Sequence, residues 1–364
     1  MRAAVLWTGL SGYLNACLKE LVSREGLELF VSHQASVPDA PFSDDQFAWI
    51  PRRLVWRSMV DFTSLRAQLR AFDPEIVVFC GWHVPGYRRI ARELAERCFR
   101  IMAMDNCWKA TPKQWLGTLI APWYVRPLAD AVWVPGERQA AFARRLGFEQ
   151  RATLWGSLSC DQPMIETVHL SRLAAGRALP HSFLFVGRFV SDKGVDQLVN
   201  AYRLYRESSG DPWPLVCCGA GPLGSRLKGK PGIRVEGFVQ PDHLRDLLAS
   251  SGCLILPSTF EPWALVIHEA TSAGLLVLSS EKAGAAVHLV QDNYNGFIFD
   301  GGDVKGLAAR MSRVSNLSDA RLDAMSQASH LLSKQFSPAR WADTLLQAFD
   351  TIQIQKVSTR FVEP

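Results

Sequence analysis

The sequence predicts an α/β protein with two consecutive doubly wound domains, each built on a parallel sheet. Two observations support this prediction. First, short apolar runs alternate with segments whose apolar residues recur at helical spacing. Second, the alternation starts again after a weakly periodic stretch between Cys160 and Pro180, so that the 364 residues divide into two domains of ordinary size.

The first domain is expected over residues 1–160. It opens with an apolar run at Ala3–Trp7, a glycine turn from Gly9 to Gly12 and a helical pattern over Tyr13–Ser23, the order typical of a doubly wound domain. A further helix is expected at Gly86–Cys98. Buried parallel strands are predicted at Leu27–Val31, Glu75–Cys80, Arg100–Met104 and Ala131–Val134.

The second domain is expected over residues 175–336. Its predicted strands are His181–Val186, Pro214–Cys218, Arg234–Glu236, Cys253–Leu256, Leu275–Leu278 and Gly296–Phe299. Its predicted helices are Val195–Ser208, Pro241–Ser250 and Trp263–Ala273. A last helix over about 337–352, with Ser337 as N-cap and Pro338 at its first position, can pack back onto the first domain.

Composition excludes several classes of protein. The net charge of +5 is too mild to indicate nucleic-acid binding, although residues 1–159 hold the whole excess, with 20 Lys and Arg against 15 Asp and Glu. The eight cysteines show no metal-ligand spacing, which favours reduced thiols in a cytoplasmic protein. No apolar stretch is long enough to span a membrane, and polar residues interrupt the signal-like opening.

Two cations follow the predicted strand that ends at Val186. The segment reads Gly187-Arg188-Phe-Val-Ser-Asp-Lys193-Gly194, so that glycines frame an arginine and a lysine between a strand and a helix. Arginine offers a planar fork of donors and lysine a compact charge, a combination that suits a diphosphate. In parallel sheets, ligands bind beyond the carboxyl ends of the strands. We therefore expect an anion site here rather than two solvated charges.

Two carboxylates form the second constellation. Glu261 lies in the turn after Cys253–Leu256, and Glu269 lies eight positions on, inside the helix expected from Trp263. A helix N-terminus supplies free N–H groups for an anion, while carboxylates accept hydrogen bonds from vicinal hydroxyl groups. The alternative is that Glu261 caps the helix and that Glu269 faces solvent.

Taken in order, these motifs resemble those of a known enzyme family. They are the G-R-x4-K-G frame, Gly219-Ala-Gly221-Pro222, Val235-Glu-Gly-Phe238, Pro257-Ser258, E-x7-E and Asp292-Asn-Tyr-Asn-Gly-Phe297. Together they resemble the retaining glycosyltransferases of family 4, of the glycosyltransferase group 1 type, most strongly over residues 181–300. That family has the GT-B fold, in which two Rossmann-like domains face a central cleft.

The resemblance implies a role for each matching residue. Arg188 and Lys193 would hold the diphosphate of a nucleotide-sugar donor and neutralise the leaving group, so that no metal or other cofactor is expected. Glu261 would contact the sugar and Glu269 the ribose. Catalytic roles are expected for Arg188, Lys193, Glu261 and Asp105. The full set of expected donor-binding residues is Gly9, Gly12, Gly187, Arg188, Lys193, Gly219, Phe238, Val239, Ser258, Glu261, Trp263, Ala264, Leu265 and Glu269.

Two features depart from the family pattern. The position after Glu-Pro-Trp is commonly glycine, whereas this chain has Ala264, whose methyl group narrows the approach to the phosphates. The segment Ala283–His288 lacks the acidic residue often found before Leu-Val.

Acceptor-side candidates follow two strands of the first domain. His83 comes after the run that ends at Cys80, and Asp105 and Asn106 come after the run that ends at Met104. Asp105 could orient or deprotonate an acceptor hydroxyl and His83 could contact the transferred sugar. Equally, Asp105 and Asn106 could cap the next helix and His83 could be a packing residue.

Two stretches of the first domain mix cations with large apolar residues, one from Pro51 to Arg70 and the other from Trp108 to Arg126. Basic amphipathic helices with tryptophan suit an anionic membrane surface, where a lipid-linked acceptor would be met. The alternative is that these apolar residues fill the core.

The sequence thus predicts a cytoplasmic retaining hexosyltransferase. Such an enzyme could bind the inner face of the cell membrane as a peripheral protein. It would move a sugar from a nucleotide-diphosphate sugar to a glycan or lipid-linked acceptor of a bacterial envelope polysaccharide. Two other functions stay open: a catalytically silent sugar-nucleotide binding protein and a sugar-nucleotide epimerase of the same fold.

Overall fold

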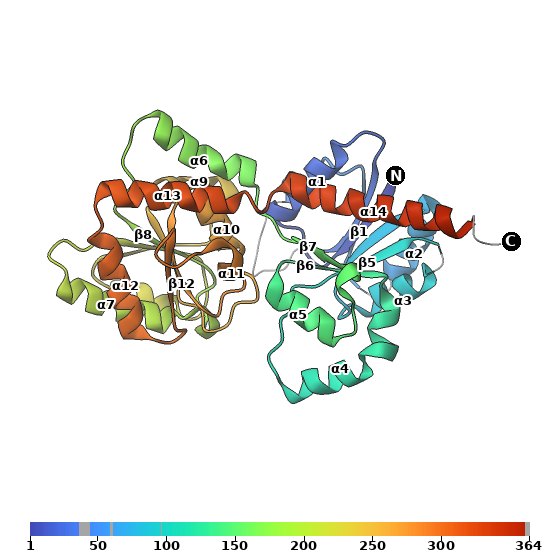
Figure 1. The fold of residues 1–364 in the computed structure, drawn as a ribbon, viewed down its shortest axis with the longest axis horizontal. Coiled ribbons are helices and arrows are strands. Elements are labelled where there is room, and N and C mark those ends of the chain that lie inside the picture. The colour runs from blue at the N-terminus through green and yellow to red at the C-terminus, as the bar shows by residue number, and fades with distance from the viewer. Residues whose placement is uncertain (36–43, 59–60, 96, 361–364) are drawn as a thin grey trace. The chain divides into compact units, whose positions relative to one another are not determined.

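The computed structural model describes residues 1–35, 44–58, 61–95 and 97–360, with side chains up to residue 351. The chain divides into two compact units (Figure 1). The first unit combines Met1–Cys160 with Ser337–Pro364, and the second unit is Asp161–Phe336. The segment between Cys160 and Pro180, which the sequence pattern leaves between domains, contains a helix of the second unit.

In the first unit, the described residues form a seven-stranded parallel sheet with the order β3-β2-β1-β4-β5-β6-β7. The strands are β1 (Arg2–Trp7), β2 (Glu28–Gln34), β3 (Arg52–Trp56), β4 (Ile76–Cys80), β5 (Phe99–Ala103), β6 (Ala131–Val134) and β7 (Thr153–Trp155). The direction of winding reverses between β1 and β4, which pair from Ala3 and Ile76 onward. Ligands of doubly wound sheets bind at such a switch point.

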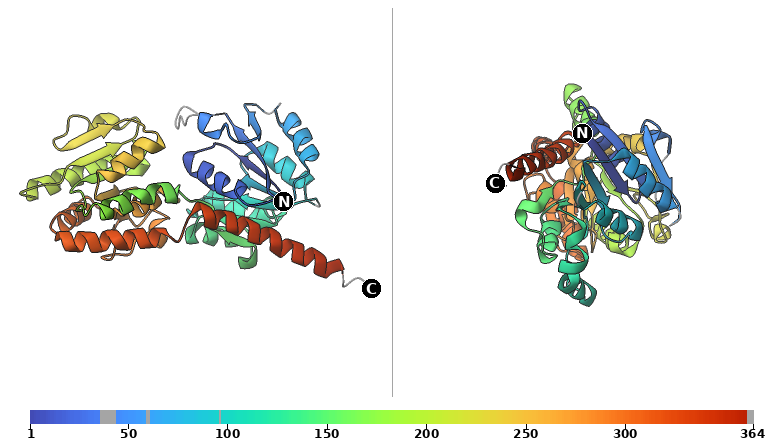
Figure 2. Two further views of the ribbon diagram at one scale, coloured as in Figure 1. Left: turned by 90° about the horizontal axis from the view of Figure 1, so that it is seen from above. Right: turned by 90° about the vertical axis from the view of Figure 1, so that its right-hand side faces the viewer.

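Helices of the first unit cover this sheet. They are α1 (Gly12–Val22), α2 (Asp61–Phe72), α3 (Pro85–Glu93), α4 (Pro112–Tyr124), α5 (Glu137–Arg145) and α14 (Pro338–Arg360), with 3-10 turns η1 (Asp44–Phe47), η2 (Arg126–Leu128) and η3 (Gln150–Ala152). Figures 1 and 2 show α14 lying along the first unit. The buried ring of Trp341 lies 4.6 Å from that of Trp133, tilted by 31°, and its indole N–H donates to the Ser157 carbonyl.

In the second unit, the described residues form a six-stranded parallel sheet with the order β10-β9-β8-β11-β12-β13. Its strands are β8 (Phe183–Val186), β9 (Leu215–Cys218), β10 (Ile233–Glu236), β11 (Cys253–Leu256), β12 (Leu276–Ser280) and β13 (Gly296–Phe299). Its helices are α6 (Gln162–Ala174), α7 (Val195–Ser208), α8 (Gly224–Leu227), α9 (Pro241–Ala249), α10 (Leu265–Ser272), α11 (Ala286–Leu289), α12 (Val304–Ser315) and α13 (Asp319–Ser333), with the 3-10 turn η4 (Ser191–Lys193). Its switch point lies between β8 and β11.

The basic stretch that follows Pro51 differs from the expected amphipathic helix. Arg52–Trp56 form the edge strand β3, and only then does α2 begin. The apolar side chains of α2, with Phe62 and Leu65 among them, are buried, and the Trp56 indole N–H donates to the buried Tyr87 hydroxyl. For this stretch the core-filling alternative is therefore correct. An edge strand lacks the uninterrupted apolar run of a central strand, which is why its pattern misleads.

Candidate functional site at the edge of the second sheet

The two central strands of the second sheet deliver the predicted donor-site residues to one edge. β8 and β11 are hydrogen-bonded neighbours, and both run in the same direction. Arg188 and Lys193 follow β8, whereas Glu261 follows β11. Because the two strands flank the switch point, residues 68 positions apart in the chain meet where such sheets bind their ligands.

The loops after these strands are tied together by their backbones. The Thr259 N–H donates to the Asp192 carbonyl over 2.9 Å. Gly194, the N-cap of α7, has φ +71° and lies against Pro257, so that a Cβ atom would come within 2.1 Å of the Pro257 carbonyl oxygen. Only glycine combines this backbone conformation with so close an approach. The glycine of the G-R-x4-K-G frame thus fixes the position of Lys193 in the loop.

Lys193 and Glu261 form an ion pair in which the lysine ammonium contacts Oε2 of the carboxylate. The pair is largely shielded, because the lysine side chain is 20% exposed and the glutamate side chain 9%. Arg188 is exposed, and its guanidinium forms no ion pair with any described residue. The site therefore offers one free cation and one cation held by a carboxylate.

Glycines bring the neighbouring loops against the same edge. Gly187 N–H donates to the Cys218 carbonyl, and Gly219 N–H donates to the Gly237 carbonyl, so that the turns after β8, β9 and β10 form one connected surface. Gly219 has φ +144°, and a Cβ atom there would come within 2.0 Å of the Gly187 carbonyl oxygen. Phe238, expected near the base of the nucleotide, follows β10 and is 39% exposed, and Val239 is partly buried beside it.

Helix α10 presents its N-terminus at this edge, but it begins later than the pattern predicts. Trp263 was expected to be its first residue, whereas Leu265 is. Ala264 stands at the N-cap with φ +76°, a left-handed conformation that costs an alanine about 1–2 kcal/mol. The family's usual glycine suits this conformation, so that the departure at Ala264 is accommodated as backbone strain.

Glu269 lies one turn into α10 in surroundings poor in water. Removal of water around its carboxylate raises the pKa of Glu269 to about 7. No hydrogen bond or ion pair to this carboxylate is found among the described residues. Burial, then Glu236 and Glu269, raise the pKa of the Cys218 thiol to about 11, so that Glu269 lies near the end of β9. Glu269 is partly buried, and its raised pKa favours a water-poor position over the solvent-facing alternative.

Two buried polar atoms belong to the loop that carries Glu261. The Ser258 hydroxyl and the Trp263 indole N–H are buried, and within the described ranges neither has a hydrogen-bond partner. The sequence reasoning missed Gly284, whose N–H donates to the Glu261 carbonyl over 3.0 Å. A Cβ atom at Gly284 would lie 1.9 Å from the Pro262 carbonyl oxygen. The Gly-Ala-Ala run after Ala283 was the available signal of this close approach.

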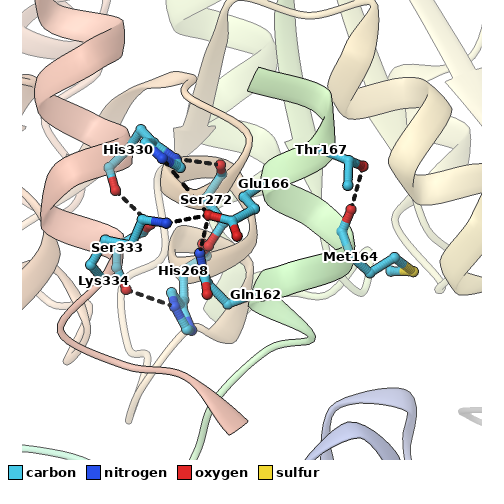
Figure 3. A network of polar contacts seen from close by, with 9 residues as sticks. All are labelled: Gln162, Met164, Glu166, Thr167, His268, Ser272, His330, Ser333 and Lys334. Atoms are coloured by element: carbon cyan, nitrogen blue, oxygen red, sulfur yellow. Dashed lines mark hydrogen bonds and ion pairs between the residues drawn. The ribbon is translucent and has the colours of Figure 1, made fainter. Parts of the chain in front are cut away.

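A polar network, also missed by the sequence reasoning, holds α10 between α6 and α13 (Figure 3). Glu166 of α6 accepts hydrogen bonds from Gln162 and from Lys334, which follows α13. His268, the residue before Glu269, is fully buried, and its Nε2 contacts the Ser333 carbonyl. Burial lowers the pKa of His268 to about 4. The helix that carries Glu269 is thus held by polar contacts to α13, which Lys334 in turn ties to α6.

The remaining candidates lie in the first unit, after β1, β4 and β5. Gly9 is exposed and Gly12 begins α1, while His83, Asp105 and Asn106 are exposed. Burial raises the pKa of Tyr13 to about 12 and Asp105 adds to the rise, so that Asp105 lies near the start of α1. The capping alternative for Asp105 and Asn106 is wrong. Helix α4 is capped by Thr111, whose hydroxyl accepts from the Gln114 N–H.

Among the described residues, no three His, Cys, Asp or Glu side chains gather as ligands for one metal ion.

Residues 180–331 match the sequence model of the family described as glycosyl transferases group 1. The second unit matches the glycosyltransferase group 1 family. The match contains the cation turn, both carboxylates and the glycine turns described above.

Two curated relatives each match about a third of the chain. The uncharacterized glycosyltransferase YqgM of Bacillus subtilis is 29% identical over 124 residues, which are 32% of this chain and 34% of the relative. The amylovoran biosynthesis glycosyltransferase AmsK of Erwinia amylovora is 27% identical over 149 residues, which are 37% of this chain and 36% of the relative. The chain spans about a third of the length of these glycosyltransferases.

A solved structure resembles the chain over both units. HepE of Anabaena, crystallised in complex with UDP, has a TM-score of 0.71 at 15% identity, and the likeness covers 96% of this chain and 100% of HepE. At this identity the likeness shows the fold. The predicted GT-B class, with two Rossmann-like parallel-sheet domains, is confirmed.

Proposed function

We propose that this chain is a retaining glycosyltransferase of family 4 that transfers a hexose-type sugar from a nucleotide-diphosphate sugar to an acceptor hydroxyl group. One observation carries the proposal. Arg188, Lys193 and Glu261 follow the two strands at the switch point of the second sheet, and Glu269 lies near them on α10, so that the four suit the diphosphate and the hydroxyl groups of such a donor. The family match over 180–331 and the UDP complex of HepE support it.

Each side chain takes a part of the donor. The exposed Arg188 fork and the Lys193 ammonium bind the diphosphate oxygens, with the first N–H groups of α10 beside them. Glu261 accepts hydrogen bonds from the sugar and Glu269 from the ribose hydroxyls. Phe238 and Val239 lie along the base. Glu269 binds as the carboxylate, so that its proton leaves when the donor arrives.

The Lys193–Glu261 ion pair keeps both side chains in place before the donor binds. An unpaired carboxylate that is 9% exposed would be costly, and Lys193 removes that cost. The donor then exchanges this contact for two others, because its phosphates attract the ammonium and its sugar hydroxyls donate to the carboxylate. The same two residues therefore serve the empty and the filled site.

In the proposed reaction the bond between C1 of the sugar and the phosphate oxygen breaks, while a bond between C1 and the acceptor oxygen forms on the same face. The acceptor proton passes to the leaving phosphate, either directly or by way of Asp105, so that no protein nucleophile is required. Arg188 and Lys193 stabilise the negative charge that grows on the nucleoside diphosphate. We propose that these cations, rather than a metal ion or another cofactor, perform this task.

The first unit supplies the acceptor side of the proposal. Gly9 and Gly12 border the diphosphate, Asp105 orients or deprotonates the acceptor hydroxyl, and His83 and Asn106 contact the sugars. The acceptor is a glycan or a lipid-linked saccharide of a bacterial envelope polysaccharide. The name of AmsK, an amylovoran biosynthesis glycosyltransferase, supports a biosynthetic role. We propose that the enzyme works in the cytoplasm, at the inner face of the cell membrane.

The first experiment identifies the donor by thermal shift with UDP, GDP, ADP and their sugars. A ligand at 100 times its Kd stabilises the folded state by about 2.7 kcal/mol, which is easily seen. Conversion of the donor is then measured with and without saccharide acceptors. The released nucleotide reports turnover, and the anomeric configuration of the product reports the stereochemistry. Retained configuration supports the proposal, whereas inversion, epimerisation of the donor or binding without turnover contradicts it.

Variants test the residue roles in the same assay. Arg188→Ala or Lys193→Ala is expected to lower kcat by about 10²-fold or more, the scale of one charge-stabilising donor. Arg203→Ala is the matched control, because Arg203 forms an exposed ion pair with Glu207 on α7. Wild-type turnover in the Arg188 variant, or an equal loss in the Arg203 variant, would contradict the assignment.

A further inference from the structure

Helix α4 of the first unit has its large apolar side chains on the outside. Trp123 is 77% exposed, Leu119 68% and Leu116 61%, and these three recur at helical spacing along one face. Trp115, Ile120 and Tyr124 are exposed beside them. Of the thirteen residues of α4, all of them described, only Ala121 is buried. A helix that packs on a core has the opposite arrangement, with large apolar residues inside.

The inward face of α4 explains how the helix is held. Gly117 and Ala121 lie one turn apart, and Val125, one turn further, is buried. The Val125 N–H continues the helix by donating to the Ala121 carbonyl. Ala121 therefore seats the helix, whereas a Cβ atom at Gly117 would meet nothing within 4 Å, and six large side chains are exposed. Figure 1 and the right-hand view of Figure 2 show α4 as an outlying helix of the first unit.

Cations border this outer face, and carboxylates are absent from its sequence. Residues 106–129 contain Lys109, Lys113 and Arg126 but no Asp or Glu. Arg88 of α3 lies 5.2 Å from the centre of the Tyr124 ring and donates to its hydroxyl. At the other end, Arg145 lies 4.7 Å from the centre of the Trp108 ring, which packs against Trp115. Both ends of the apolar face thus carry positive charge.

We propose that α4 is the element by which this chain docks on an anionic lipid bilayer. The helix lies in the plane of the interface, with Leu116, Leu119 and Trp123 among the lipid chains and the bordering cations against the phosphates. At 1.5 Å per residue its thirteen residues extend for about 20 Å along the surface. The docking deepens the proposed function, because it brings the first unit to lipid-linked acceptors. The link to the acceptor rests on the proposed function, whereas the docking itself does not.

Charge favours a bilayer over a second copy of the chain. Two copies joined through α4 would bring Lys113 and the bordering arginines of both molecules together, with no carboxylate on the helix to offset them. Anionic headgroups supply that opposite charge. No helix in the described ranges is long and apolar enough to cross a membrane.

The test is sedimentation of the full chain with vesicles of phosphatidylcholine, alone or mixed with phosphatidylglycerol, at low and at physiological salt. We expect binding to the anionic vesicles that weakens as salt is added. Leu119→Glu is expected to lower the binding constant at least tenfold. Lys113→Gln is expected to lower it about fivefold on anionic vesicles and to have no effect on neutral ones.

Leu331→Glu is the matched control, because Leu331 is 63% exposed on α13 of the second unit. Failure of the wild type to sediment, or an equal loss in the Leu331 variant, would overturn the proposal. The proposal would also be overturned if light scattering showed that the wild type is a dimer and that the Leu119→Glu variant is a monomer. The nucleotide-induced thermal shift separates the two proposals. Vesicle binding without nucleotide binding refutes only the proposed function, and the converse refutes only the docking surface.

Discussion

Glu269→Gln is expected to stabilise the protein while it weakens nucleotide binding. The pKa of Glu269 is about 7 in the folded chain, against an ordinary value of 4.5. Between pH 4.5 and pH 7 the Glu269 carboxyl is ionised in the unfolded chain but still holds its proton in the folded chain. The free energy of unfolding therefore falls as the pH rises through this range. Each pKa unit corresponds to about 1.36 kcal/mol, which gives a cost of up to about 3 kcal/mol above pH 7.

Glutamine has nearly the same shape but carries no charge, so that this cost disappears. For a domain of 150–250 residues, 1 kcal/mol corresponds to about 2–4 °C in Tm. We therefore expect Glu269→Gln to raise Tm by up to about 6–12 °C at pH 8. Near pH 5 the gain falls below about 1 kcal/mol, because the carboxyl of the folded wild type is then neutral.

The assay is thermal unfolding of the nucleotide-free protein at a series of pH values, taken as the difference between variant and wild type so that other titrating groups cancel. Glu281→Gln is the matched control, since Glu281 forms an exposed pair with Lys282 and its loss should matter little. In the same variant, loss of the hydrogen bonds from ribose to a carboxylate should weaken nucleotide binding about 10- to 100-fold. A Tm gain that is absent, or equal at pH 5 and pH 8, would refute the reasoning.

Two further predictions concern α10 and its support. Ala264→Gly should raise Tm by about 1–2 °C. Glycine relieves the strain of φ +76°, but the loss of backbone entropy and of a buried methyl group offsets part of this gain. Ala264→Val should lower Tm by several degrees. Equal effects in differential scanning calorimetry would refute this account. Because the pKa of His268 is about 4 in the folded chain and 6.5 unfolded, its contribution to stability should fall by about 3 kcal/mol between pH 6.5 and 4. Urea midpoints across this range should decline less in His268→Asn than in the wild type, and parallel curves would contradict the assignment.

Local patterns predicted the elements whose signals are local. Val195–Ser208, Cys253–Leu256 and Gly296–Phe299 have the expected bounds, because apolar periodicity and flanking glycine or proline are both visible in the sequence. The edge strands β3 and β7 were not expected. An edge strand is only half covered, so it does not need the continuous apolar run that reveals a buried parallel strand.

The candidate site was predictable in its residue types but not in its pairings. The motifs placed Arg188, Lys193, Glu261 and Glu269 after strands or at a helix start, and the sheet order brings the first three to one edge. That Lys193 is held by Glu261 follows from the pairing of β8 with β11. The desolvation of Glu269 depends on neighbours distant in sequence, which spacing alone does not specify.

Sequence by itself determined which residues share a face, and tertiary structure alone decided what covers that face. α2 and α4 show the difference, since both join cations to large apolar side chains. The apolar side of α2 is buried against the first sheet, whereas that of α4 remains in solvent. Helical periodicity fixes the angle between side chains around an axis. The rotation of that axis depends on contacts made elsewhere in the chain, such as the close seating of Ala121.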